Sequence, residues 1–235
     1  TYAAIQIKNL MARSSQLKYK DFAVFMRLNA LSRAFEQEFT KYGIPYRIFG
    51  GFRFFERKEI KDVLSYLKVI NNPSDDESFL RSIAAPKRGI GDKTLRELRE
   101  FAASSGLSMY GAIERIDFTT MGAAAKTKLF NYKTLLDSFK AYSLNHRVAE
   151  TIEYVIETTG FNEQFAEKNE ENASRLYNLS ELKNSAEQFE KDNGGATLSD
   201  YLNSVTLSSD TDDINEDDAV TIATNMAGRG ADIKL

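Results

Sequence analysis

Residues 85–94, Ala-Pro-Lys-Arg-Gly-Ile-Gly-Asp-Lys-Thr, combine the residue types in this chain that are best suited to binding an anion. The pattern indicates a helix, a tight glycine turn and a second helix. A Gly-Ile-Gly turn that leads into a helix N-terminus points several backbone N–H groups the same way, which suits a phosphate. The basic side chains add charge and the threonine hydroxyl adds a donor. The candidate contacts are Lys87, Arg88, Gly89, Gly91, Lys93 and Thr94. A plain corner between two helices remains the alternative, since two glycines suffice for it.

A second basic stretch follows the glycine pair Gly50-Gly51, which permits the positive φ of a sharp turn. Arg53, Arg57 and Lys61 come next, at spacings of four residues. A helix that began near Phe54 would place all three in one stripe at its N-terminal end, where the helix dipole favours an anion. We expect Phe54 and Phe55 to be core residues.

The composition gives little support to cysteine chemistry, metal binding, nucleotide hydrolysis or membrane association. The chain has no cysteine, so disulfides and thiolate chemistry are excluded. Its one histidine, His146, lacks a second histidine or a cysteine, which favours a surface position at a helix start over a metal site. We assign no catalytic and no metal-binding residue. The phosphate-binding pattern G-x-x-x-x-G-K-[ST] of nucleotide hydrolases is absent, so these 235 residues alone are not expected to hydrolyse ATP. No signal peptide or run of about 18 apolar residues occurs, so we expect a cytoplasmic protein without a membrane partner.

Charged residues are divided unevenly along the chain. Residues 1–72 carry seven more basic than acidic residues, whereas the rest carries ten more acidic than basic residues. Such asymmetry fits a polyanion that meets one part of the molecule. The alternative is that helical proteins scatter charge unevenly by chance.

The elements that must position these residues fall into two groups. Near the N-terminus, strand 22–26, a helix with Leu31, Phe35 and Phe39 on one face, strand 46–49 and a helix from about Arg57 indicate an α/β layer. From about residue 73 to 207 the apolar spacing is helical, and a strand over 219–223 follows. The expected helices are 77–84, 93–104, 108–116, 120–144, 148–159, 174–191 and 198–207.

Three blocks in this order carry a family resemblance: FMRLNALSRAFEQEF, IPYRIFGGFRFFERKEIKDVLSYLK and PKRGIGDKTL. They resemble the second motor domain of UvrD/Rep/PcrA-type superfamily 1 ATP-dependent DNA helicases, together with the helical domain inserted in it. The resemblance implies a mainly α fold, in which a helical inserted domain is attached to a partial RecA-like α/β domain. The implied parts are residues 1–72 (partial motor domain), 73–217 (inserted domain) and 218–235 (return strand).

The resemblance also implies a function and its residues. The chain would be a DNA-binding fragment of a helicase that translocates on single-stranded DNA and unwinds duplex, in repair or replication. Arg27 and Thr224 would contact DNA, Lys61 would lie at a DNA-facing junction, and the 85–94 block would be a helix-hairpin-helix element that grips duplex. ATP and Mg²⁺ would serve the full-length parent and would not bind this fragment alone. Implied partners are DNA, a missing first motor domain and repair proteins.

The end of the chain departs from that family. The usual pattern is T-V-H-x-x-K-G-L-E-F, but here Met226 stands at the histidine position and Arg229 at the lysine position. The segment ATNMAGRGADIKL is instead similar to motif V of the protein-export ATPase SecA. Thr224 is the polar residue that keeps its place.

Two other functions therefore remain as alternatives. One is a motor subdomain of a protein-export ATPase, which would bind unfolded peptide. The other is a non-catalytic helical module that recruits proteins and ignores DNA.

Overall fold

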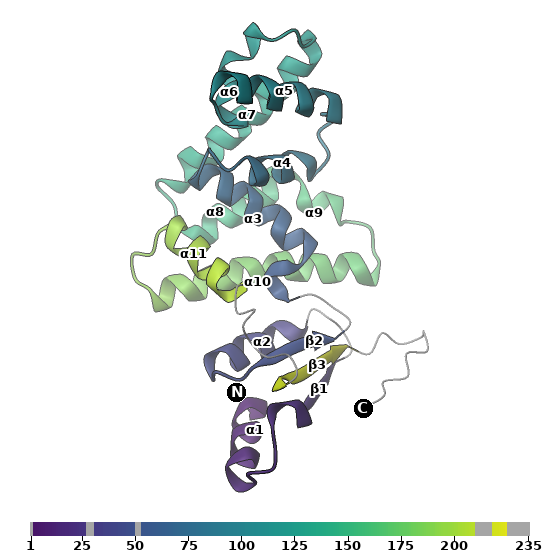
Figure 1. Cartoon of the computed structure of the whole chain (residues 1–235), viewed down its shortest axis with the longest axis vertical. Helices are drawn as coiled ribbons and strands as arrows, with labels where there is room; N and C mark the ends of the chain where they lie inside the picture. The colour runs from purple at the N-terminus through teal and green to yellow at the C-terminus, as the bar shows by residue number, and fades with distance from the viewer. Residues whose placement is uncertain (1, 27–30, 50–52, 210–217, 225–235) are drawn as a thin grey trace. The chain divides into compact units, whose positions relative to one another are not determined.

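The structure is a computed structural model that describes residues 2–26, 31–49, 53–209 and 218–224. The fold is mainly helical, with one small parallel sheet (Figure 1). This confirms the expected fold class. The chain divides into two compact units: residues 1–57 with 206–235, and residues 58–205. We call them the sheet unit and the helical unit.

Three parallel strands form the sheet: β1 (Ala23–Met26), β2 (Tyr46–Phe49) and β3 (Val220–Thr224). Their order is β1-β3-β2, so the last strand of the chain lies between the first two. In the register, Val24 and Ile48 both stand opposite Ile222. Val220 and Ile222 of β3 lie in the core, whereas Thr221 between them is half-buried and accepts from the Arg47 Nε at 3.1 Å.

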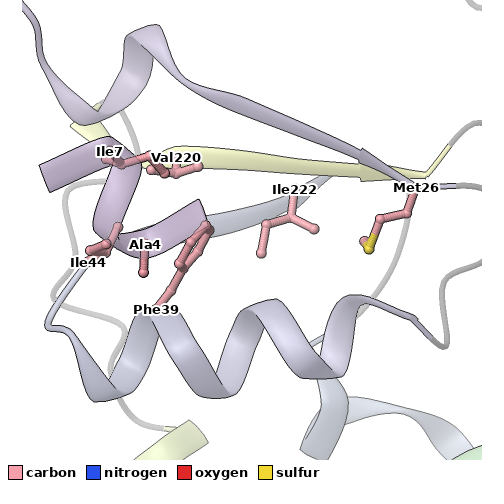
Figure 2. Close-up of a cluster of buried hydrophobic side chains, with 7 residues drawn as sticks. All are labelled: Ala4, Ile7, Met26, Phe39, Ile44, Val220 and Ile222. Atoms are coloured by element: carbon pink, nitrogen blue, oxygen red, sulfur yellow. The ribbon is translucent and has the colours of Figure 1, made fainter. Parts of the chain in front are cut away.

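Two helices, α1 (Tyr2–Arg13) and α2 (Ser32–Lys41), and two short 3₁₀ turns, η1 (Tyr19–Asp21) and η3 (Phe54–Glu56), complete the described part of the sheet unit. Figure 2 shows how its core is built: side chains from both helices point toward β3. The buried cluster consists of Ala4, Ile7, Met26, Phe39, Ile44, Val220 and Ile222. Residues more than 200 positions apart therefore share this core.

The helical unit begins with α3. Its elements are α3 (Lys58–Asn71), α4 (Asp76–Ala84), α5 (Asp92–Ser105), α6 (Met109–Ala112), η4 (Ile113–Phe118), α7 (Ala123–Ser143), α8 (Val148–Thr159), α9 (Phe161–Gln164), α10 (Glu170–Asp192) and the start of α11 (Leu198–Ser209).

Helix α3 is the centre of the helical unit, since it packs against α4, α7, α8 and α10 (Figure 1). Because most faces of α3 are buried, its polar side chains have little access to water and need hydrogen-bond partners within the protein. Glu59 and Asp62 both have such partners. The Asn178 amide donates to Glu59 Oε1 at 2.5 Å, and Arg81 pairs with Asp62 at 2.7 Å. These contacts join α10 and α4 to α3.

The expected elements are largely present, and the differences have local causes. Strand β2 and helix α8 have the expected bounds. Helix α10 begins at Glu170, four residues earlier than expected, because Asn169 caps it by accepting from the Asn172 N–H at 2.7 Å. The helix expected over 108–116 is the short α6 followed by a 3₁₀ stretch that kinks at Arg115. Among the described residues, no helix has both the length and the apolarity needed to cross a membrane.

Candidate nucleic-acid interface

The glycine turn predicted at residues 85–91 connects α4 to α5 in the helical unit (Figure 1); we call it the hairpin. Gly89 has φ +66°, a conformation that residues with a Cβ rarely adopt. A Cβ built at Gly89 would lie 3.1 Å from the Lys128 Nζ. The backbone conformation therefore favours glycine here, whereas the Lys128 Nζ ends a flexible, exposed side chain that can move away from a Cβ.

Gly91 is different, because its backbone conformation does not favour glycine. It is the N-cap of α5 with extended φ and ψ of −92° and 166°, and a Cβ built there meets no atom within 4 Å. Helix N-caps usually carry Ser, Thr, Asp or Asn, whose oxygen accepts from the first backbone N–H groups. Glycine leaves those N–H groups of α5 without a side-chain cap, so an oxygen from outside the protein has access to them.

Two lysines of the hairpin region are well placed for an external anion. Lys87 is exposed, and the Lys93 side chain is 89% exposed with only a loose 3.8 Å pair to Glu97. Exposed pairs of this kind contribute little free energy and are easily exchanged for another anion. Thr94, in the first turn of α5, is half-buried.

A third lysine reaches the hairpin from α7, and the sequence analysis missed it. The exposed Lys128 donates from Nζ to the Gly89 carbonyl at 2.7 Å. Lys128 lies 39 residues further along the chain, inside a helix with no motif, so no local signal could have indicated the contact. The tertiary structure thus adds a cation at the glycine turn.

Arg88 does not join these exposed side chains. Its Nη2 donates to the Tyr66 hydroxyl at 2.7 Å, and its guanidinium lies over the rings of Tyr66 and Tyr132, 5.8 and 5.5 Å from their centroids. Arg88 is half-buried and makes no ion pair with any residue in the described ranges. Neutral partners therefore hold it, and its charge is not cancelled by a carboxylate.

The two tyrosines beneath Arg88 are buried and hydrogen-bonded. Tyr66 donates to the Ala85 carbonyl at 2.7 Å, and the Tyr132 hydroxyl lies 2.5 Å from Ser82 Oγ. Burial raises the pKa of Tyr66 to about 12, against the opposing effect of the nearby Arg88. Burial also raises the pKa of Tyr132 well above its usual value. Both phenols are accordingly neutral at ordinary pH.

Arg57, in the sheet unit, is also held by hydrogen bonds within the protein. It is 7% exposed, and its Nη2 lies 2.6 Å from Ser32 Oγ and 3.2 Å from Glu36 Oε1. The second oxygen of Glu36 accepts from the Phe54 N–H at 2.8 Å. One buried carboxylate thus fixes both the backbone at Phe54 and the guanidinium of Arg57.

The basic stripe expected from Arg53, Arg57 and Lys61 does not form, because α3 begins at Lys58 and not near Phe54. Arg53 is the half-buried N-cap of η3, with its guanidinium 5.8 Å from the Tyr46 ring centroid. Lys61 is exposed on α3. The core position expected for Phe54 is confirmed, since it is 1% exposed. The same expectation for Phe55 is wrong, because Phe55 is only half-buried.

Two predicted contacts belong to the sheet unit. Thr224 ends β3, where its backbone pairs with Met26. Arg27 lies outside the described residues, as do Met226 and Arg229. The DNA contacts of Arg27 and Thr224 stay predictions.

Over the described ranges, no group of three or more His, Cys, Asp or Glu side chains could bind a metal ion. The nucleotide-binding glycine pattern is absent from the whole sequence.

Comparison with known proteins gives a consistent result. The model of the UvrD-like helicase C-terminal domain matches residues 1–231. The ATP-dependent DNA helicase PcrA of Bacillus subtilis is 34% identical over 226 residues, which cover 93% of this chain and 31% of that protein. The PcrA helicases of Staphylococcus aureus (31% identical, 93% of this chain and 30% of that protein) and Staphylococcus epidermidis (30%, 97% and 32%) are also similar. The chain thus spans about a third of the length of these relatives.

Proposed function

This chain belongs to the UvrD-like helicase C-terminal family, and from this premise we propose that it is the DNA-binding part of an ATP-dependent DNA helicase. The observation that carries the proposal is the family match over residues 1–231. The larger protein would move along single-stranded DNA and unwind duplex, in repair or replication. Its partners would be a first motor domain and repair proteins.

The hairpin is the proposed grip on the duplex backbone. Lys87, Lys93 and Lys128 would neutralise phosphates, and the uncapped N–H groups after Gly91 would donate to a phosphate oxygen. Such contacts fix position without reading sequence, which suits an enzyme that must act on any duplex. Thr94, in the first turn of α5, would add a hydroxyl donor.

Further DNA contacts are proposed from the family resemblance. They are Arg27, Arg53, Lys61 and Thr224. Arg57 is assigned a structural role, because its guanidinium is already bonded to a buried carboxylate.

ATP and Mg²⁺ enter the proposal only as cofactors of the larger protein. Since this sequence lacks a P-loop, we expect the isolated chain not to hydrolyse ATP. Mixing it with ATP and Mg²⁺ and following phosphate release tests that expectation.

The two alternative functions predict different ligands. A protein-interaction module would leave duplex DNA unbound, and an export motor would prefer unfolded peptide to DNA. The family match favours neither alternative.

Binding to a labelled duplex with a 3′ single-stranded tail, across a salt series, is the direct test. We expect log affinity to fall linearly with log salt, with a slope of about −0.9 for each phosphate contacted. Absence of binding at low salt, or a tighter complex with unfolded peptide, would contradict the proposal.

Gly91→Asp tests the hairpin itself, since an aspartate there caps α5 with its own carboxylate. We expect stability to stay equal or to rise by about 0.5–1 kcal/mol, because aspartate is a favoured N-cap. Duplex affinity should nevertheless fall at least tenfold, because the new carboxylate occupies the phosphate position. The matched control is Gly122→Asp, which places the same charge at the equally open N-cap of α7. Equal losses from both variants would reject the hairpin as the contact.

A further inference from the structure

We infer that Arg88, Tyr66 and Tyr132 are positioning residues that hold the hairpin in its binding conformation, and that Arg88 does not itself contact phosphate. This inference rests on the proposed function, because it concerns the same DNA-binding hairpin. It differs from the role that the sequence suggests for Arg88.

The first argument is the way the hairpin is attached. Tyr66 of α3 holds the carbonyl of Ala85, and Lys128 of α7 holds the carbonyl of Gly89. Arg88 lies between these two points and bonds to the same Tyr66 hydroxyl. Three hydrogen bonds within five residues thus join the turn to two helices of the core. A loop held in this way loses less conformational freedom when it binds a ligand.

The second argument is the shape of the Arg88 site. Tyr66 and Tyr132 are both buried, and their rings form a T-shaped pair 6.4 Å apart with Arg88 near both faces. The Arg88 Nε is itself buried and has no hydrogen-bond partner among the residues that the structure describes. The guanidinium therefore faces the aromatic rings, which attract a cation.

The third argument concerns charge. The hydroxyls around Arg88 are neutral, so its positive charge remains in the field of the hairpin even though the side chain is engaged. Charges within about one Debye length, roughly 8–10 Å at physiological salt, still attract an anion without touching it. Arg88 would thus attract the DNA backbone from beneath the turn, while the exposed lysines make the contacts.

Tyr66 is the informative residue for a test, because Tyr66→Phe keeps the ring and removes the hydroxyl that bonds both Arg88 and Ala85. In the free protein, we expect hydrogen exchange of the 87–91 amides to accelerate about fivefold, the size of one hydrogen bond. Affinity for the tailed duplex should fall about three- to tenfold with an unchanged salt slope, because no charged contact is lost.

Two comparisons separate positioning from direct contact. Lys87→Ala should reduce the magnitude of the salt slope by about 0.9, as loss of one phosphate contact requires. The duplex affinity of the double variant Tyr66→Phe/Arg88→Ala should lie within about twofold of that of Arg88→Ala, because both substitutions break the same hydrogen bond between Arg88 and Tyr66. Tyr110→Phe is the matched control, since it removes a hydrogen-bonded phenol from α6, and it should leave hairpin exchange and affinity unchanged.

The opposite results would overturn the inference. If Arg88 contacts phosphate, Tyr66→Phe, which releases Arg88, would leave duplex affinity unchanged or raise it. The effects of Tyr66→Phe and Arg88→Ala on affinity would then be additive in the double variant. Unchanged amide exchange in Tyr66→Phe also rejects positioning. If the unaltered chain binds no duplex, the proposed function fails, while hydrogen exchange still decides whether Tyr66 and Arg88 hold the hairpin.

Discussion

Arg57 and Arg88 each stand within a few residues of two glycines in the sequence, but their positive charges have opposite surroundings. Arg57, in the sheet unit, is bonded to the buried Glu36, and that pair has no net charge. Arg88, in the helical unit, is held by a neutral phenol and two aromatic rings and keeps its charge. An arginine held by its own protein can therefore serve only the fold or also the electrostatic field of a binding site, according to the charge of the group that it bonds.

The same comparison separates two kinds of basic residue in the helical unit. Lys87 and Lys93 are exposed, and the pair of Lys93 with Glu97 is loose at 3.8 Å, so both side chains can bind a phosphate. Arg88 is engaged by its own protein. Four predictions, from the largest expected effect to the smallest, test these differences.

Glu36→Ala should have the largest effect, because it leaves the Arg57 guanidinium buried without its carboxylate and frees the Phe54 N–H. We expect a loss of about 3–5 kcal/mol in the free energy of unfolding, as for other broken buried ion pairs. Urea unfolding measures it. The control is Gln37→Ala, at the next, exposed position of α2, which should cost less than about 0.5 kcal/mol. A loss below about 1 kcal/mol for Glu36→Ala would show that the pair is not structural.

Raising the pH from 10 to 12 should lower the free energy of unfolding, because the folded chain holds Tyr66 in its neutral form. The pKa of Tyr66 is raised to about 12 in the folded chain by burial, so above pH 10 the unfolded chain releases its proton first. The free energy of unfolding is thus unaffected below pH 10 and falls between pH 10 and 12, by roughly 2–3 kcal/mol for a shift of this size. Comparing unfolding of the unaltered chain and Tyr66→Phe over this range isolates the effect. Parallel curves for the two proteins would contradict it.

Arg88→Ala should destabilise the chain less than Arg57→Ala does. Truncating Arg57 leaves a buried carboxylate unpaired, whereas truncating Arg88 leaves only neutral phenols that keep their other hydrogen bonds. We expect about 1–2 kcal/mol for Arg88→Ala and about 3–5 kcal/mol for Arg57→Ala. Equal losses of unfolding free energy for the two variants would contradict the idea that the charge of the group bonded to the arginine determines the cost of truncating it.

Lys93→Ala should change stability least, by no more than about 0.5 kcal/mol, because its pair with Glu97 is exposed and long. Its effect should instead be on duplex binding, with a reduction of about 0.9 in the magnitude of the salt slope. Thermal unfolding and the salt series are measured on the same preparation. A destabilised variant with an unaltered slope would place Lys93 among the structural residues.

Much of the fold was predictable because its signals are local. The strand 46–49 and the helix 148–159 follow from apolar spacing and from the glycine that ends the helix. The glycine turn at residues 85–91 was also predictable, because positive φ at Gly89 is a property of that residue type. The interrupted helix after Ser108 was missed, since nothing in the residue types around Arg115 indicates a kink.

The candidate site was only partly predictable. The sequence indicated Lys87, Arg88 and Lys93 as equals, because a side chain's charge is visible in the sequence and its partner is not. Lys128 had no signal, since its contact with Gly89 arises only when α7 packs near the hairpin. The stripe through Arg57 does not form because α3 begins only at Lys58, and Arg57 itself is held by Glu36, 21 residues earlier, a partner that the sequence does not reveal.

By itself, then, the sequence determined the glycine turn, most helices, the family resemblance and the supply of basic residues. Only the tertiary structure decided which cations are engaged and which are available. The physical reason is that a charge is useful to a ligand according to what already surrounds it. A carboxylate removes the charge of Arg57, neutral rings preserve that of Arg88, and water leaves Lys87 open to phosphate.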